Sequence, residues 1–124
     1  MSKAASLIYV ADDDPDILEL ISIVLTRGGF EVVGFETADA LMAALAVRTP
    51  AAALLDVRIP GQSGLDALKA IKDDSATAHI PVLMLTGDGR LDRIVQAMQL
   101  GAAGYVMKPF DGAQLVERVR SLLL

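Results

Sequence analysis

Short apolar runs alternate with segments of helical spacing along this chain, and this alternation constrains the fold more than any other feature. The runs with strand character are expected at Leu7–Ala11, Glu31–Phe35, about Ala51–Leu55, from Val82 onward, and at Tyr105–Met107. Such runs, each followed by an amphipathic helix, are typical of a parallel sheet covered on both faces. The sequence therefore predicts an α/β fold: a single doubly wound parallel sheet of five βα units, forming one domain over residues 1–124.

Capping residues and helix breakers set the expected bounds of the helices. The helices are expected from about Pro15 to the Gly28-Gly29 pair, from a Thr37 cap to about Arg48, at about Leu65–Asp73, at about Leu91–Leu100, and from about Asp111 to the C-terminus. In the helix over 91–100, the spacing of Leu91, Val95 and Met98 predicts the buried face. The methionines expected in the core or in helix packing are Met42, Met84, Met98 and Met107.

The composition fits one folded domain and argues against several classes of function. Of the 124 residues 53% are apolar, yet no apolar stretch approaches the roughly 20 residues of a membrane span. The N-terminus lacks a long apolar region with a cleavage pattern, so we expect a cytoplasmic protein. The absence of cysteine excludes disulfides and thiolate metal sites. A net charge of −5 without any basic cluster argues against direct binding of nucleic acid.

Functional side chains follow four of the expected strands at the point where each strand ends. Asp12-Asp13-Asp14 follows the first strand, Asp56 ends the third, Thr86 ends the fourth, and Lys108 follows the fifth. Because the carboxyl ends of parallel strands meet at one edge of a sheet, these side chains should converge. Crowded carboxylates repel unless a cation sits among them, and an all-oxygen site suits Mg2+, which also binds phosphate oxygens. Thr86 and Lys108 supply a donor and a positive charge for that phosphate, so the set predicts phosphoryl transfer to an aspartate.

The acidic run after the first strand also has an ordinary structural explanation. Acidic residues complement the dipole at a helix N-terminus, and Asp14 before Pro15 is a suitable N-cap. We accept this explanation for Asp14 and Asp16. For Asp12 and Asp13, the second acidic strand end at Asp56 favours metal binding.

Four motifs, in this order and each at a strand end, give the chain its resemblance to a known family. They are Asp12-Asp13, Asp56–Gly64 (DVRIPGQSG), Thr86-Gly87 and Gly101–Phe110 (GAAGYVMKPF). From about Leu7 to about Leu123, the chain resembles the receiver domain of bacterial two-component response regulators, such as the chemotaxis regulator. The resemblance implies a flavodoxin-like fold with the strand order 2-1-3-4-5.

The resemblance also implies roles for the acidic residues. Asp56 holds the place of the aspartate that accepts the phosphoryl group. Asp13 would ligate Mg2+ directly, whereas Asp12 would act mainly through a bound water. Arg58 would contribute its backbone carbonyl to the metal.

Further roles concern charge stabilisation and switching. Thr86 and Lys108 would stabilise charge on the transferring group, and the Lys108-Pro109 bond is cis in resembling domains. Tyr105 holds the place of an aromatic that turns inward when the threonine hydroxyl moves toward the phosphate. The surface formed by the segments 91–100 and 105–107 and the C-terminal helix would then change. Ile94 and Val116 have no obvious core position and are expected on this surface beside Tyr105.

The implied function is a phosphorylation-dependent signalling switch and not a turnover enzyme. A histidine kinase or a histidine phosphotransfer protein would present phosphohistidine to Asp56, and the changed surface would control a partner that the sequence does not identify. We expect a monomer or a phosphorylation-dependent dimer that contacts neither nucleic acid nor membrane.

Two alternatives are open. We expect a stand-alone regulator, because the given sequence stops here, but the chain also fits the N-terminal receiver of a longer regulator with a DNA-binding or enzymatic output domain. Receivers of winged-helix transcription factors often have acidic residues where this chain has Ala103-Gly104. This difference argues against the kind of dimer that those receivers form. The second alternative is a Mg2+-dependent phosphohydrolase of the haloacid dehalogenase type. The pattern Asp12-x-Asp14 resembles the nucleophile motif of those enzymes. Those enzymes need a longer chain and a further acidic pair.

Overall fold

Strands and helices alternate throughout the computed structural model, which describes residues 5–59, 63–87 and 91–123. The strands are β1 (Leu7–Ala11), β2 (Glu31–Phe35), β3 (Ala52–Asp56), β4 (Val82–Thr86) and β5 (Gly104–Met107). The helices are α1 (Pro15–Arg27), α2 (Ala38–Leu45), α3 (Gly64–Asp73), α4 (Leu91–Gln99) and α5 (Gly112–Leu122). Residues 60–62 of the motif that follows β3 lie outside the described residues. All ten predicted elements are present, and α2 differs most from its predicted bounds because it ends before Arg48.

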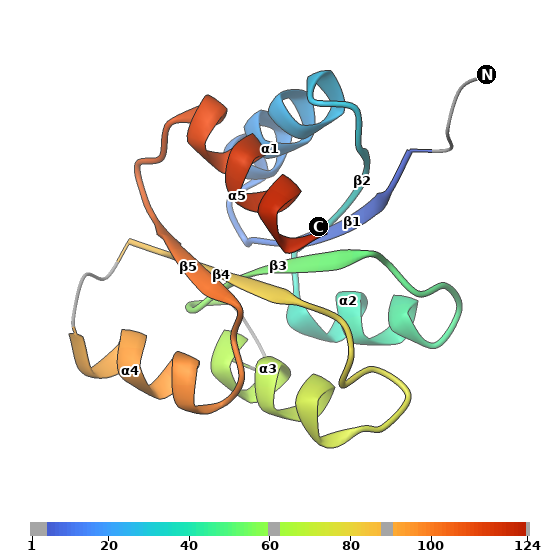
Figure 1. The fold of residues 1–124 in the computed structure, drawn as a ribbon, viewed down its shortest axis with the longest axis vertical. Coiled ribbons are helices and arrows are strands. Elements are labelled where there is room, and N and C mark those ends of the chain that lie inside the picture. Colours follow the sequence, from blue (N-terminus) through green and yellow to red (C-terminus); the bar gives the residue numbers. More distant parts are fainter. Residues whose placement is uncertain (1–4, 60–62, 88–90, 124) are drawn as a thin grey trace.

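The strands form one parallel sheet in the order β2-β1-β3-β4-β5, which confirms the order that the resemblance implies. Figure 1 shows α1 and α5 on one face of the sheet and α2, α3 and α4 on the other. The chain runs from β1 outward to β2 and then returns to β3 on the opposite side of β1. This reversal leaves a crevice at the carboxyl ends of β1 and β3, which is where such sheets bind ligands.

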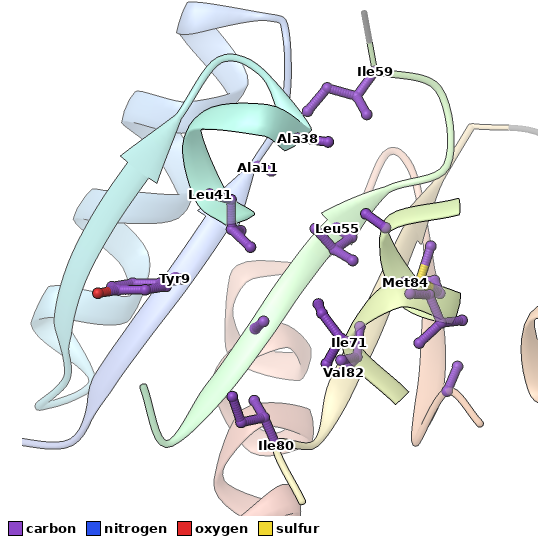
Figure 2. Packing of buried hydrophobic residues seen from close by; sticks show 14 of the residues in the cluster. Tyr9, Ala11, Ala38, Leu41, Leu55, Ile59, Ile71, Ile80, Val82 and Met84 are labelled. Carbon is purple, nitrogen blue, oxygen red and sulfur yellow. The ribbon is translucent and has the colours of Figure 1, made fainter. Parts of the chain in front are cut away.

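Each face of the sheet has its own hydrophobic core, because side chains alternate along a strand. Figure 2 shows part of the core beneath α2, α3 and α4, where Tyr9, Leu55 and Met84 meet Leu41 and Ile71. The opposite core contains Ile8, Val10, Leu54 and Leu83 from the sheet, with Ile21 and Leu25 of α1 and Leu115 and Val119 of α5. Strands β1, β3 and β4 are buried along their whole length, so the carboxyl ends of these strands are packed between the two cores. None of the described helices has the length and apolar character that crossing a bilayer requires.

The predicted helix caps are present. The Asp14 carboxylate accepts the backbone N–H of Asp16 at 2.9 Å and caps α1, and Thr37 Oγ1 accepts the N–H of Ala40 at 3.1 Å and caps α2. Asp14 is therefore occupied in helix capping, as predicted, and β1 is followed at once by α1.

The predicted buried face of α4 is wrong. Leu91, Val95 and Met98 are 73%, 44% and 45% exposed, and Ala97 is the buried residue of this helix at 2%. The inward stripe instead combines Ala97 with the half-buried Arg93, Ile94 and Leu100. Both stripes have helical spacing, so spacing alone does not distinguish them. The small Ala97 side chain lets the helix approach the sheet with the face that carries Ala97.

Two further expectations about packing are also wrong. Met98 and Met107 are exposed, at 45% and 38%, and do not join the core. Val116 does not lie on the surface beside Tyr105, because it packs between α5 and α1 in the second core. A Cβ atom added to Gly28 would lie 3.0 Å from Val116 Cγ1, so a close crossing of these helices fixes Val116 there. The exposed apolar surface of α4 and β5 consists of Leu91, Val95, Met98, Tyr105 and Met107.

Candidate functional site

Strands β1 and β3 bring three carboxylates to one end of the sheet. The strands are adjacent and parallel with Ala11 opposite Leu55, so Asp12 and Asp56 follow at the same level. Asp12 is fully buried, Asp56 is 6% exposed, and Asp13 is exposed. Carboxylate oxygens of the three residues lie within 4.8 Å of one another. The convergence predicted from the strand ends is confirmed.

The residue after β5 adds an ammonium group to these carboxylates. The Lys108 N–H donates to the Thr86 carbonyl at 2.7 Å, and the Lys108-Pro109 peptide bond is cis, as the resemblance implies. Lys108 Nζ lies 2.6 Å from Asp12 Oδ2 and 2.6 Å from Asp56 Oδ2. Lys108 therefore bridges both buried carboxylates with charge-assisted hydrogen bonds.

The backbone fixes the other oxygen of each buried carboxylate. Asp12 Oδ1 accepts the N–H of Asp14 at 3.0 Å, and Asp56 Oδ1 accepts the N–H of Arg58 at 2.8 Å. Both contacts are side-chain turns that span two residues and orient the carboxylate without help from a ligand. The orientation of both buried carboxylates is therefore set by the backbone that directly follows each strand.

The electrostatics of the site are dominated by burial and by the Lys108 bridge. Burial raises the pKa of the Asp56 carboxyl, although the hydrogen bonds from Lys108 and from the Arg58 N–H act in the opposite direction. Burial alone lowers the pKa of Lys108, but the hydrogen bonds and charges of Asp12 and Asp56 outweigh it, so the Lys108 pKa lies above its ordinary value. Three carboxylates face one ammonium group, and this excess of negative charge favours a bound cation.

The donor set fits a hard divalent cation. One oxygen from each of Asp12, Asp13 and Asp56 is close enough to the others to share an ion. Oxygen ligands of this kind are those that Mg2+ prefers, and Asp13 faces the solvent from which a hydrated ion arrives. The contribution of the Arg58 carbonyl stays a prediction.

The site opens to solvent through a pocket of about 520 Å³. Its lining consists of Asp13, Asp56, Arg58, Thr86, Gly87 and Lys108. Thr86 is 3% exposed, and a Cβ atom added to Gly87 would meet no atom within 4 Å, so the entrance beside Thr86 is open. A groove of about 580 Å³ between β5 and α5 is slightly larger, but it lacks the buried carboxylates and is not the chemical centre.

Two predicted site residues do not line the pocket: Asp12, which is fully buried behind it and held by Lys108, and Tyr105. Tyr105 is 36% exposed on β5, and it lines a cavity of only about 10 Å³ together with Thr86 and Ile94. Tyr105 and Thr86 thus border the same small cavity next to α4, so a movement of the threonine side chain would change the space beside Tyr105.

Arg93 lies next to the pocket and was not among the predicted site residues. With Asp13, Val57, Arg58, Ile59 and Ser63, this residue lines a groove of about 480 Å³ next to the pocket. The only available signal was an arginine in the first turn of the helix after Thr86-Gly87, which does not distinguish it from any surface arginine.

Comparison with known families identifies the domain. Residues 8–120 match the family described as the response regulator receiver domain. The chain is 35% identical over 116 residues to the phosphate regulon transcriptional regulatory protein PhoB of Pseudomonas aeruginosa, covering 94% of this chain and 51% of that protein. It is 39% identical over 118 residues to the DNA-binding dual master transcriptional regulator RpaA of Synechocystis, covering 94% of this chain and 48% of that protein. The chain spans about half the length of these curated relatives.

Solved structures give the same result. A putative response regulator from Chloroflexus aurantiacus superposes with a TM-score of 0.92 at 29% identity, covering 96% of this chain and 98% of that one. The chemotaxis protein CheY4 of Vibrio cholerae superposes with a TM-score of 0.91 at 25% identity, covering 97% of this chain and all of that one (100%).

Gly64 should tolerate no side chain. A Cβ atom added there would lie 2.0 Å from the Asp56 carbonyl oxygen, and the Gly64 N–H donates to the Val57 carbonyl at 3.1 Å. We expect Gly64→Ala to lower the free energy of unfolding by at least about 2 kcal/mol, measured by urea denaturation, because the loop after β3 must shift. Gly87→Ala is the matched control, since its added Cβ meets no atom within 4 Å and it should cost far less. Equal stability of both variants would contradict the tight packing at Gly64.

Without metal, Asp56→Asn should stabilise the fold at neutral pH. Folding raises the pKa of Asp56, so its ionisation destabilises the folded state as the pH rises above the unfolded value of about 3.9. The gain in Tm over the parent, measured in EDTA, should be small near pH ~4 and grow to a few degrees by about pH 7. Lys108 stays charged throughout this range and does not alter the trend.

The control for this measurement is Glu19→Gln, which removes one exposed negative charge on α1. Its Tm should follow that of the parent at every pH. A pH-independent difference for Asp56→Asn, or a loss of stability at neutral pH, would mean that burial does not govern this carboxyl.

Proposed function

Because the chain belongs to the response regulator receiver domain family, we propose that it is a signalling switch in which Asp56 accepts a phosphoryl group from phosphohistidine. The donor is a histidine kinase or a histidine phosphotransfer protein, and the switch works in the cytoplasm. The observation that carries the proposal is the contact of Lys108 with both Asp12 and Asp56 at 2.6 Å beside the exposed Asp13. Members of this family accept a phosphoryl group and are not turnover enzymes.

In the proposed reaction, an Asp56 carboxylate oxygen attacks the phosphorus of phosphohistidine. The bond from oxygen to phosphorus forms, the bond from phosphorus to the imidazole nitrogen breaks, and the histidine leaves with the bonding electrons. The Arg58 N–H and Lys108 orient the carboxylate before the reaction, so the catalytic contribution is positioning and charge stabilisation.

We propose that Asp12, Asp13 and Asp56 hold Mg2+ with the Arg58 carbonyl. When bound, this ion supplies positive charge for the carboxylates and for the phosphoryl oxygens. Lys108 can then turn from Asp56 to the new phosphoryl group while it keeps its contact with Asp12. The Thr86 hydroxyl donates to a phosphoryl oxygen from the opposite wall, and Gly87 leaves the donor room to enter.

The proposed output is a change on the surface of α4, β5 and α5. Thr86 lines both the phosphoacceptor pocket and the small cavity that Tyr105 borders, so a shift of Thr86 toward the phosphate changes the space beside Tyr105. Tyr105, which borders this cavity, is one of the exposed apolar residues of α4 and β5, and a partner that covers these residues would sense the change.

A second candidate concerns the output. The relatives PhoB and RpaA are named as transcriptional regulators, and this chain matches about half of each. These names support control of a DNA-binding domain carried elsewhere in the same polypeptide. DNA binding by the present chain itself is disfavoured by its net charge of −5.

The phosphohydrolase alternative receives no support from the site. Its motif requires Asp14 as a second catalytic acid, but the Asp14 carboxylate accepts the backbone N–H of Asp16 and caps α1. The acidic partner of Asp12 is instead Asp56 on the neighbouring strand.

Asp56 should be the only residue that acetyl phosphate modifies in the presence of Mg2+. Intact-mass measurement and mapping of the aspartyl phosphate should find it in the parent and find none in Asp56→Asn. Asp14→Asn is the matched control, because asparagine is an equally good helix cap and the phosphoacceptor is unchanged. Phosphorylation of Asp56→Asn at the parent's level would refute the assignment of Asp56.

The exposed Asp13 carboxylate should contribute strongly to the affinity for Mg2+. Removing its charge in Asp13→Asn should weaken Mg2+ binding by at least about tenfold in a calorimetric titration, because a direct ligand is lost. Asp16→Asn removes a nearby exposed charge outside the pocket and should weaken binding far less. Equal Mg2+ affinity in Asp13→Asn and the parent would exclude Asp13 as a ligand.

A further inference from the structure

A second groove continues the phosphoacceptor pocket toward α4. It has a volume of about 480 Å³ and shares Asp13 and Arg58 with the pocket. Val57 and Ile59 are buried and form its apolar floor, and Arg93 lines it from α4. Any molecule that presents a phosphoryl group to Asp56 and extends toward α4 therefore passes two guanidinium groups.

Arg93 lies where the groove meets the interior. Arg93 is half-buried in the first turn of α4, and it lines both the outer groove and the small cavity beside Thr86 and Tyr105. A side chain with an apolar stem and a charged end can line both spaces, because the stem packs against apolar neighbours while the guanidinium group stays in water. Arg93 forms no ion pair within residues 5–59, 63–87 and 91–123. A guanidinium group on a half-buried side chain, without an acidic partner in the part of the chain that the structure describes, is well suited to bind an anion.

The charges around the groove indicate which ligand it suits. Lys108 is engaged by Asp12 and Asp56 inside the pocket, so Arg58 and Arg93 supply the positive charge of the groove. Asp13 is the acidic residue of its lining, and its carboxylate is the one we assign to Mg2+. The apolar floor reduces the exposure of bound groups to water and strengthens a contact between guanidinium and carboxylate groups.

We propose that Arg58 and Arg93 bind an acidic side chain of the phosphodonor protein next to its phosphohistidine, and thereby select the donor. Arg93 does not line the pocket around Asp56, so its ligand is a neighbouring group of the donor and not the phosphoryl group itself. The imidazole enters over Asp56, and the residues that flank it lie over the groove. This inference rests on the proposed function, because it requires phosphohistidine as the donor.

The test uses short phosphohistidine peptides as defined donors. In one peptide glutamates flank the phosphohistidine, in a second glutamines replace them, and in a third lysines replace them. The initial rate of phosphorylation is followed by intact mass with Mg2+ present. The parent should react roughly three to ten times faster with the glutamate peptide than with the glutamine peptide, and this ratio should fall at high salt.

Variants of Arg93 give the decisive comparison. Arg93→Gln should bring the ratio of glutamate to glutamine rates close to one, and Arg93→Lys should keep part of it because the charge remains. Arg93→Glu should reverse the preference so that the lysine peptide reacts faster than the glutamate peptide. Arg27→Gln, which removes an exposed positive charge at the far end of α1, is the matched control and should keep the parent's ratio. Thermal unfolding verifies that each variant is folded.

The outcomes separate this inference from the proposed function. A parent ratio near one, or a ratio that Arg93→Gln leaves unchanged, would overturn the acidic-donor subsite while Asp56 remains the acceptor. The proposed function is tested independently by phosphoimidazole, which carries no flanking residue. Failure of phosphoimidazole and Mg2+ to modify Asp56 in the parent would overturn the proposed function itself.

Discussion

The Lys108 ammonium group holds two buried carboxylates together, and the active end of the sheet depends on this contact. Lys108 is 96 residues from Asp12 and 52 from Asp56, and it follows β5, whereas Asp12 and Asp56 belong to β1 and β3. Its side chain must cross the end of β4 to reach them, and β4 ends there in Thr86 followed by Gly87. Neither residue is large enough to block that path. The site is therefore complete only when four of the strands have assembled.

The cluster also shows how the fold accommodates an unfavourable arrangement of charge. One ammonium group does not balance three carboxylates, and two of these are buried. Backbone N–H groups of Asp14 and Arg58 hold the buried carboxylates in place, so they do not turn away from one another. The carboxylates attract the Lys108 ammonium group, and the negative charge that this group leaves unbalanced attracts a cation. A cation bound among these carboxylates would relieve their repulsion and would thereby link ligand binding to stability.

The strands, the helix caps and the convergence of the acidic residues could be predicted, because each follows from local periodicity or from the end of a strand. The face that α4 buries could not be predicted, since its exposed stripe of Leu91, Val95 and Met98 is as apolar as its inward one. Val116 was misplaced for a related reason: its environment is set by the close approach of α5 to Gly28, a tertiary contact without a local signal. Arg93 was missed because a side chain with both an apolar stem and a charged end fits either face of a helix.

The proposed recognition of the donor and the proposed output both involve α4. This helix has Ala97 as its buried residue, so it is attached to the sheet by a narrow stripe. Arg93 near its start lines both the groove beside the phosphoacceptor pocket and the cavity shared by Thr86 and Tyr105. A donor carboxylate that draws the guanidinium group outward and a phosphate that draws Thr86 inward would therefore act on the walls of the same small cavity. The cavity holds only about 10 Å³, so a void left by a displaced side chain would favour a compensating shift of α4 or Tyr105. In the proposed switch, packing around this cavity would couple the charge change at Asp56 to Tyr105 and the neighbouring surface of α4 and β5.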